Sequence, residues 1–418
     1  MPHPPIKKSI LIIGAGPVGI EAALYAKSAG YQARILEKGE VAHNVRQWQH
    51  VTFFSPFGMN HSLPGKKLLA EQGIPLPGNE EYLSGRAYLE RYLFPLANSP
   101  FLKPHIITGC EALAVSRRGI LKNEHISDGQ RANYPFRILT RDRQGREKIY
   151  ESDYLIDASG SYGNPNWLGD GGIPAPGELA NRHRIQYHLE DVAGEAKSKY
   201  AGKTALVAGE GHSAATSIVA LAQLMEENPR TRVIWITRGG GETPLVPIPD
   251  DPLKERERIV REANRLTAHP NVRRIKNAAV NALEYDERSG KFRVEASSPG
   301  GALFLEVDHV IANVGYSPDN NIYRELQVHE CYASRAPMKL AAALLGQSSA
   351  DCLTQPAPDA QVLRNPEPDF YIIGMKSYGK NSNFLLKTGF EQIRDVFRLI
   401  SGDNALDLNR PEAAGAEE

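Results

Sequence analysis

The chain has 418 residues, 41% hydrophobic and 23% charged, proportions typical of a soluble globular protein of about two to three domains. Its 49 Lys and Arg balance 49 Asp and Glu, so net charge gives no support for binding nucleic acid or an anionic membrane. No uncharged apolar run reaches the roughly 18 residues of a membrane span. Three cysteines without a CxxC pair suit a reducing compartment. We therefore predict a cytoplasmic protein with no nucleic-acid or membrane partner.

The first predicted element is a strand, turn and helix near the N-terminus. The apolar run SILII leads into the glycine turn GAGPVG, and the helix-favouring run IEAALYAKSAG follows. In such a turn Gly14 permits the tight bend, Gly16 lets the backbone approach a pyrophosphate, and Gly19 lets the helix pack on the strand. The next strand, QARIL, ends in Glu37, whose carboxylate suits the hydroxyls of a ribose. This unit predicts a dinucleotide site, to which we also assign Pro17, Val18 and Lys38.

Two hairpins follow, each leading into a returning apolar strand. The first hairpin spans 136–154 and turns at Gln144–Gly145, and the second, within 292–312, turns at 299–301. The returning strands are LIDASG, which places Ser159 and Gly160 at its end, and IANVGYSPD. Each half of the chain therefore predicts the same order of elements.

A second glycine turn, VAGEGHSA, lies 195 positions after the first. Gly209 and Gly211 match the first two glycines, and Ala214 replaces the third, which this turn allows. The following strand, RVIWITR, places Arg238 where the first unit has Glu37, with no acid beside it. An arginine attracts the 2′-phosphate of NADPH and a carboxylate repels it, so this unit predicts NADPH, with a solvated loop arginine as the alternative. Two further predicted contacts are His212 and Ser213.

GAGPVG with Glu37, LIDASG and GEGHSA resemble the motifs of flavoproteins with two dinucleotide-binding domains. This group includes thioredoxin-reductase-like enzymes and flavin-containing monooxygenases, and the resemblance covers nearly the whole chain. It implies FAD in the first turn and NADPH in the second. It also implies an α/β fold of two Rossmann-like, three-layer ββα domains, with the NADPH domain inserted into the FAD domain. The implied map is an FAD domain at 1–165 and 320–405, an NAD(P)H domain at 166–319 and a flexible tail at 406–418.

Two features favour the monooxygenase branch of this group. They are the G-x-G-x-S-A form of the second turn and the aromatic segment RQWQHVTFFSPF. The CxxC of a disulfide reductase is missing, and Cys331 and Cys352 stand 21 positions apart. One feature departs from the branch: its F-x-G-x-x-x-H signature is reduced to His183 and Tyr187 within IPAPGELANRHRIQYHLED.

The C-terminal region also resembles a flavin site. The group has a Gly-Asp pair whose carboxylate binds the flavin ribityl chain, whereas this chain has Gly374 followed by Met375. That contact is then lost, or supplied by the backbone or by Lys376 or Ser377. The next stretch, LLKTGFEQIRDVF, resembles the helix whose N-terminus faces the flavin; a plain amphipathic helix is the alternative. Thr388 and Gly389 open this predicted helix.

Few side chains are needed for catalysis if the flavin carries the chemistry. The residues expected near its ring are Trp48, Phe53, Phe54, Ser55 and Asn60, with ordinary packing as the alternative. Trp48 and Asn60 are the predicted catalytic pair, and Gln47 and Trp48 are predicted cofactor contacts. The histidines form no HExxH or comparable cluster, so we predict no metal site.

The resemblance implies an FAD-dependent oxidoreductase in which NADPH reduces FAD. We predict a monooxygenase that uses O2, through a C4a-(hydro)peroxyflavin, to oxidise a small substrate with a nucleophilic nitrogen, sulfur or similar atom. One alternative is a reductase that passes electrons to a quinone, a disulfide or a protein acceptor. Another is a non-catalytic dinucleotide sensor in which Met375 reflects lost flavin binding. No motif identifies the substrate or the oligomeric state.

Overall fold

The computed structural model describes residues 8–346, 353 and 359–410. Two compact units divide the chain. Unit 1 comprises the described residues of Met1–Gln49, Ser55–Gly163 and Ser317–Glu418, and unit 2 comprises His50–Phe54 and Asn164–Tyr316. The second unit is therefore inserted into the first, and Asn164 and Tyr316 lie within three residues of the boundaries expected at 165/166 and 319/320. The expected map differs at residues 50–54, which it places in the FAD domain but which belong to unit 2.

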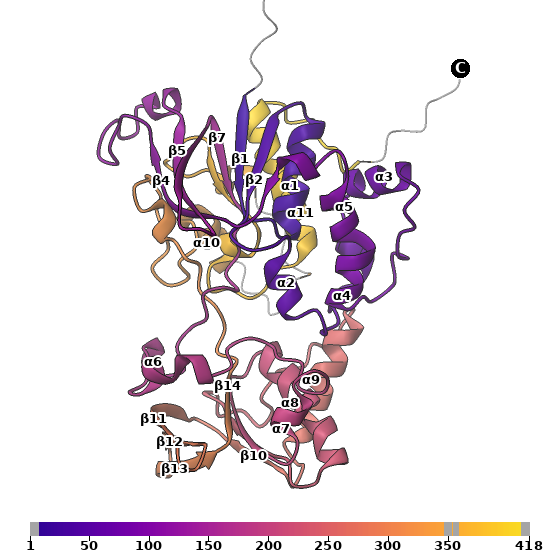
Figure 1. Ribbon diagram of the computed structural model, residues 1–418, viewed down its shortest axis with the longest axis vertical. Coiled ribbons are helices and arrows are strands. Elements are labelled where there is room, and N and C mark those ends of the chain that lie inside the picture. Colours follow the sequence, from indigo (N-terminus) through magenta and orange to yellow (C-terminus); the bar gives the residue numbers. More distant parts are fainter. Residues whose placement is uncertain (1–7, 347–352, 354–358, 411–418) are drawn as a thin grey trace, which may run out of the picture. The chain divides into compact units, whose positions relative to one another are not determined.

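Unit 1 has three layers (Figure 1). Its central sheet is parallel, with strand order β15-β7-β1-β2-β3. An antiparallel sheet of β4, β5 and β6 adds a second layer, and Val115 and Phe136 pack in one buried cluster with Leu11 and Leu155 of the central sheet. Helices α1 and α11 lie together in the helical layer, where Tyr25 stacks on Phe397. The bounds are β1 Ser9–Ile13, β2 Gln32–Leu36, β3 Ile106–Ile107, β4 Cys110–Arg117, β5 Phe136–Asp142, β6 Glu147–Ser152, β7 Tyr154–Asp157, β15 Phe370–Ile372, α1 Pro17–Ser28 and α11 Leu386–Ser401.

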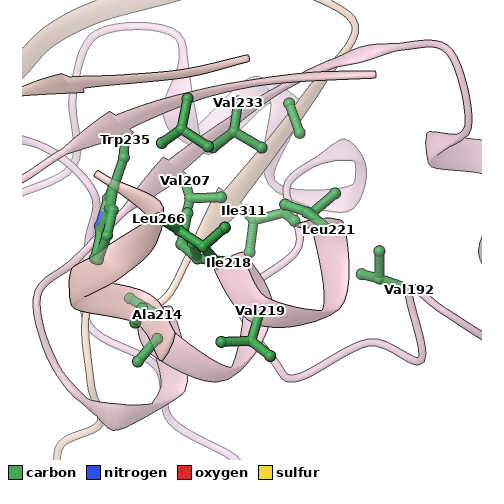
Figure 2. Close-up of a cluster of buried hydrophobic side chains, with 14 of the residues drawn as sticks. Val192, Val207, Ala214, Ile218, Val219, Leu221, Val233, Trp235, Leu266 and Ile311 are labelled. Carbon is green, nitrogen blue, oxygen red and sulfur yellow. The ribbon is translucent and has the colours of Figure 1, made fainter. Parts of the chain in front are cut away.

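Unit 2 repeats this architecture. Its parallel sheet has strand order β10-β9-β8-β14, and the antiparallel sheet consists of β11, β12 and β13. One buried cluster joins the sheet to α8 and α9, with Val207 and Ile218 near its centre and Trp235 at one side (Figure 2). The bounds are β8 Thr204–Ala208, β9 Arg232–Ile236, β10 Val272–Ile275, β11 Ala279–Asp286, β12 Lys291–Ser298, β13 Gly301–Val307, β14 His309–Ala312, α8 His212–Glu227 and α9 Lys254–Leu266.

Shorter helices complete both units. Residues 85–93 form α4 followed by one π-helical turn. The α-helices are α2 His43–Gln47, α3 Leu63–Glu71, α4 Gly85–Tyr88, α5 Phe94–Asn98, α6 Glu178–Asn181, α7 Lys197–Tyr200 and α10 Met338–Leu345, and the π-turn is Leu89–Leu93. Single 3-10 turns lie at Phe57–Met59, Lys103–His105, Gln130–Asn133, Asp170–Gly172, Arg182–Arg184, Asn321–Tyr323, Ala360–Leu363 and Gly374–Tyr378.

The predicted fold class, two Rossmann-like α/β domains with one inserted into the other, is confirmed. The tail expected from 406 needs correction, because residues 406–410 are bonded to the helices of unit 1. Leu408 N donates to the Tyr25 hydroxyl at 3.1 Å, and the Arg398 guanidinium donates to the carbonyl of Leu406. Residues 411–418 lie outside the described part of the chain. None of the described helices is long and apolar enough to cross a membrane.

Candidate dinucleotide-binding sites

Two of the three glycines in the first turn are closely packed, and the third faces open space. Gly14 has φ +101°, and a Cβ placed on it would lie 2.8 Å from the carbonyl oxygen of Ala158. A Cβ on Gly19 would lie 2.0 Å from the carbonyl oxygen of Gly14. A Cβ on Gly16, in contrast, would meet no atom within 4 Å. The middle glycine therefore faces the open space that a pyrophosphate would enter.

The start of α1 is available to an anion. Gly16 is its N-cap, Pro17 is its first residue, and no side chain among the described residues caps it. Uncapped N–H groups and the helix dipole favour a phosphate at this end. Val18 lies against Gly374 and Gly389, since Cβ atoms placed on these two glycines would lie 3.5 and 2.8 Å from its side chain. The fold thus brings the C-terminal glycines to the first turn, and α11 begins at Leu386, two residues before Thr388.

Glu37 lies at the end of β2 and is only 8% exposed. Its two carboxylate oxygens accept hydrogen bonds from Ala15 N and Gly39 N, each at 2.8 Å. These bonds hold the carboxylate beside the turn, where it suits ribose hydroxyls. Lys38 is exposed, and its predicted cofactor contact stays a prediction.

A buried ion pair lies where β7 ends, and sequence reasoning missed it. The Lys376 ammonium lies 2.6 Å from the Asp157 carboxylate, and the two side chains are 1% and 0% exposed. Ser159 donates its N–H and hydroxyl to the same carboxylate, and Lys376 also donates to the Ser159 hydroxyl at 3.2 Å. Ser159 is therefore held to the 374–378 turn through Lys376. The sequence signals were one charged residue in each of two apolar stretches, Asp157 in YLID and Lys376 in YIIGMK.

The side chains of Lys376 and Ser377 are committed to protein partners, which corrects the expectation that either replaces the missing aspartate. Ser377 is fully buried and donates to the Gly374 carbonyl, while Gln392 of α11 bonds both Gly374 N and the Ser377 hydroxyl. Met375 is half-buried. Of the options predicted for the ribityl contact, this geometry leaves two: the contact is lost, or the backbone supplies it.

Trp48 and Asn60, the predicted catalytic pair, both belong to unit 1 but contact different residues. Asn60 is 2% exposed, and its amide is bonded to the Ser55 hydroxyl and to the carbonyls of Ser55 and Pro56. This bonding holds a loop closed. Trp48 follows α2, which ends at Gln47, and its ring packs against Gly85. The catalytic and cofactor roles of these residues stay predictions. Phe53 and Phe54 belong to unit 2, where the Phe54 ring meets the His212 ring at 5.4 Å.

The second turn has the same pattern of crowding. Gly209 has φ +134°, and a Cβ placed on it would lie 2.2 Å from the carbonyl oxygen of Asn313. A Cβ on Gly211 would meet nothing within 4 Å, and Gly211 is the N-cap of α8 with no capping side chain from the described residues. Ala214 is fully buried against the sheet (Figure 2). His212 is exposed and Ser213 half-buried in the first turn of α8.

Matching backbone hydrogen bonds show which residues of the two units are equivalent, and they correct the equivalence of Arg238 with Glu37. Thr237, rather than Arg238, stands at the position of Glu37, so Arg238 corresponds to Lys38. The linear comparison was wrong by one residue because only the strand register fixes it. Three bonds of unit 1 each have a counterpart in unit 2. Gly14 N to Leu36 O matches Gly209 N to Ile236 O; Glu37 N to Ile107 O matches Thr237 N to Ile275 O; and Gly109 N to Gly39 O matches Asn277 N to Gly239 O.

The expectation of no acid beside Arg238 is also wrong. Glu210 lies between Gly209 and Gly211 in the second turn, and its carboxylate accepts a hydrogen bond from the Gly239 N–H at 2.7 Å. Arg274 of β10 lies nearby: it donates to the Thr237 hydroxyl and to the carbonyls of Gly241 and Glu242. Burial lowers the pKa of Arg274, and the Glu210 charge partly offsets this. Arg238 itself is exposed.

Helix α1 carries a buried carboxyl group with hydroxyl partners. Glu21 is 2% exposed and accepts from the hydroxyls of Ser62, at 2.5 Å, and Tyr92. Burial raises the pKa of Glu21, and its hydrogen bonds with Ser62 and Tyr92 oppose this rise. The corresponding residue of α8 is Thr216, whose hydroxyl bonds the carbonyl of His212.

The cysteines that the structure describes are buried, and its described residues form no cluster of metal ligands. Cys110 and Cys331 are free and buried, and Cys352 lies outside the described residues. Within 8–346, 353 and 359–410, no group of three or more His, Cys, Asp or Glu side chains is arranged to hold a metal ion.

Comparisons with known proteins agree with this geometry. The bacilliredoxin reductase Bdr of Bacillus subtilis is 23% identical over 331 residues, which cover 77% of this chain and 81% of Bdr. The structure of the bacillithiol disulfide reductase Bdr (YpdA) from Bacillus cereus matches with a TM-score of 0.70 and 18% identity, over 95% of this chain and 99% of that one. An ornithine N-hydroxylase from Kutzneria matches with a TM-score of 0.64 and 13% identity, over 95% and 99%. At these identities the structural matches show the fold.

Two dinucleotide-binding units, one inserted into the other, define the class of two-domain flavoprotein oxidoreductases. The model of the pyridine nucleotide-disulphide oxidoreductase family matches residues 11–338, and the chain belongs to this family. It is an enzyme, an FAD-dependent pyridine-nucleotide oxidoreductase. The predicted cofactors, FAD and NADPH, and the predicted resemblance are confirmed.

Proposed function

We propose that electrons from NADPH pass through FAD to a small acceptor without a protein dithiol, and that the acceptor is O2 in the oxygenation of a nucleophilic nitrogen or sulfur. One observation carries this proposal: both described cysteines are buried. Cys110 is part of the core cluster between the two sheets of unit 1, and Cys331 is 5% exposed beside Ala336 and Ala341. Thiol–disulfide exchange requires an accessible thiolate, which neither residue offers.

Unit 1 would bind FAD, and unit 2 would bind NADPH. Bound FAD would supply the two-electron chemistry. In unit 1 the N–H groups at the start of α1 would hold its pyrophosphate, and Glu37 would accept its ribose hydroxyls. In unit 2 the start of α8 would hold the pyrophosphate of NADPH, with Arg238 and Arg274 near its adenosine end.

In the balanced reaction, NADPH and a proton supply two electrons and two hydrogens. One atom of O2 bonds to the substrate nitrogen or sulfur, and the other leaves as water. The chain needs no metal for this balance.

A disulfide reductase is the second candidate, favoured by a specific observation at Cys331. Hydrogen bonds from the backbone and side chain of Ser334 lower the pKa of the Cys331 thiol, which favours its thiolate. The name of the similar Bacillus cereus structure, a bacillithiol disulfide reductase, also points to disulfide substrates.

One pair of assays separates the candidates. We expect NADPH oxidation under isotopically labelled O2, with a panel of small amines and thioethers, to yield a product with one labelled oxygen atom. Under anaerobic conditions, we expect low-molecular-weight disulfides to release no thiol. Anaerobic thiol release that disappears in Cys331→Ser would overturn the proposal in favour of a reductase that uses Cys331. Release that persists in this variant would overturn it in favour of a reductase that does not depend on Cys331.

A further inference from the structure

The two glycine turns carry their acids on different elements. In unit 1, Glu37 reaches Gly39 N from the end of β2. In unit 2, the residue at that position is Thr237, and the acid is Glu210, which reaches Gly239 N from the turn itself. Because Gly39 and Gly239 are matched by their backbone hydrogen bonds, the two carboxylates bind equivalent N–H groups from different elements.

The location of Glu210 matters for the adenosine ribose. A carboxylate at this point of a dinucleotide-binding domain accepts ribose hydroxyls, and it repels a 2′-phosphate. Arg238 and Arg274 carry the opposite charge close by, Arg238 one residue before Gly239 and Arg274 bonded to Thr237. Unit 2 therefore combines one feature suited to a ribose diol with two suited to a 2′-phosphate.

We propose that Glu210 is a specificity-determining residue and that unit 2 accepts NADH as well as NADPH. Its carboxylate binds the 2′-hydroxyl of NADH and weakens the attraction of the arginines for the 2′-phosphate of NADPH. The proposal rests on the coenzyme role of unit 2 and not on the identity of the final acceptor.

Coenzyme binding tests this proposal without turnover. We would titrate the purified FAD-loaded protein with NADP+ and with NAD+ by calorimetry and compare the two affinities. In Glu210→Gln the amide oxygen can still accept from Gly239 N, so the turn is kept while the charge is lost. We expect the NADP+ to NAD+ affinity ratio to rise about tenfold at low salt, and the rise to shrink at high salt because Glu210 and Arg238 are exposed.

Three further variants serve as counterparts. Arg238→Gln and Arg274→Gln are expected to lower the same ratio, and Glu226→Gln, an exposed acid near the far end of α8, is expected to leave it unchanged. Flavin absorbance and the melting temperature check that each variant is folded. An unchanged ratio in a folded Glu210→Gln overturns the proposal, as does an equal rise in Glu226→Gln. A wild-type protein that binds NADP+ but no NAD+ also overturns it, and none of these results depends on the acceptor.

Discussion

The two units share a backbone and differ in how they place charge. Their glycine turns have the same crowded first glycine, the same open middle glycine and the same bond to the neighbouring strand. In unit 1 the acid beside the turn is buried and has two N–H donors, whereas Glu210 in unit 2 is exposed and has one. The backbone thus defines a dinucleotide site, and the side chains placed around it distinguish one dinucleotide from another.

A second difference lies where the returning strands end. Asp157 of β7 lies opposite Ile13 and forms a buried ion pair, whereas Ala312 of β14 lies opposite Ala208 and is apolar. The ion pair ties unit 1 to its C-terminal segment.

The largest expected effect tests the shared backbone. In Gly209→Ala the new Cβ would meet the Asn313 carbonyl at 2.2 Å in a left-handed conformation, so we expect a loss of more than about 4 kcal/mol in the free energy of unfolding. Gly211→Ala, which enters open space, should cost about 1 kcal/mol or less, mainly as a poorer N-cap, yet weaken NADPH binding. Urea denaturation and coenzyme titration measure both. Equal stability of the two variants would contradict the crowding argument.

The next effect tests the ion pair that only unit 1 has. Lys376→Met leaves the Asp157 carboxylate buried without its cation, so we expect a loss of about 3 kcal/mol and reduced FAD content. The double variant with Asp157→Asn removes the uncompensated charge and should recover much of that loss. Urea midpoints and the flavin-to-protein absorbance ratio are the measurements. A single variant as stable as the wild type would show that the pair does not hold the 374–378 turn.

The smallest effect tests the buried acid of α1, where α8 has Thr216. Because burial raises the pKa of Glu21 in the folded state, the folded protein binds this proton more tightly than the unfolded chain. Its contribution is therefore present at low pH and lost as pH rises from the ordinary carboxyl value through the raised one. Glu21→Gln cannot titrate, so its melting temperature should fall less over this range. Glu90→Gln, an exposed acid of the same unit, should follow the wild type, and a Glu21→Gln profile parallel to both would refute the assignment.

The sequence alone predicted much of this molecule. Both units, the hairpins at 136–154 and 292–312 and the two turns follow from local rules: apolar strands need burial, and Gly14 and Gly209 adopt φ values that other residues avoid. The repeat of the glycine turn 195 positions later then predicted two dinucleotide-binding domains. FAD and NADPH followed from the resemblance that these motifs carry.

Only the tertiary structure decided which charges meet. Lys376 pairs with Asp157, 219 positions away in the sequence, and Glu210 accepts a hydrogen bond from Gly239, 29 positions away. Both contacts form because parallel strands bring their carboxyl ends to one edge of a sheet. A shift of one residue separates Arg238 from the position of Glu37, and only the hydrogen-bond register reveals it. Side-chain pairing over such separations depends on strand order and register, which are properties of the folded chain. The glycine turns are determined locally, and the charges around them are not.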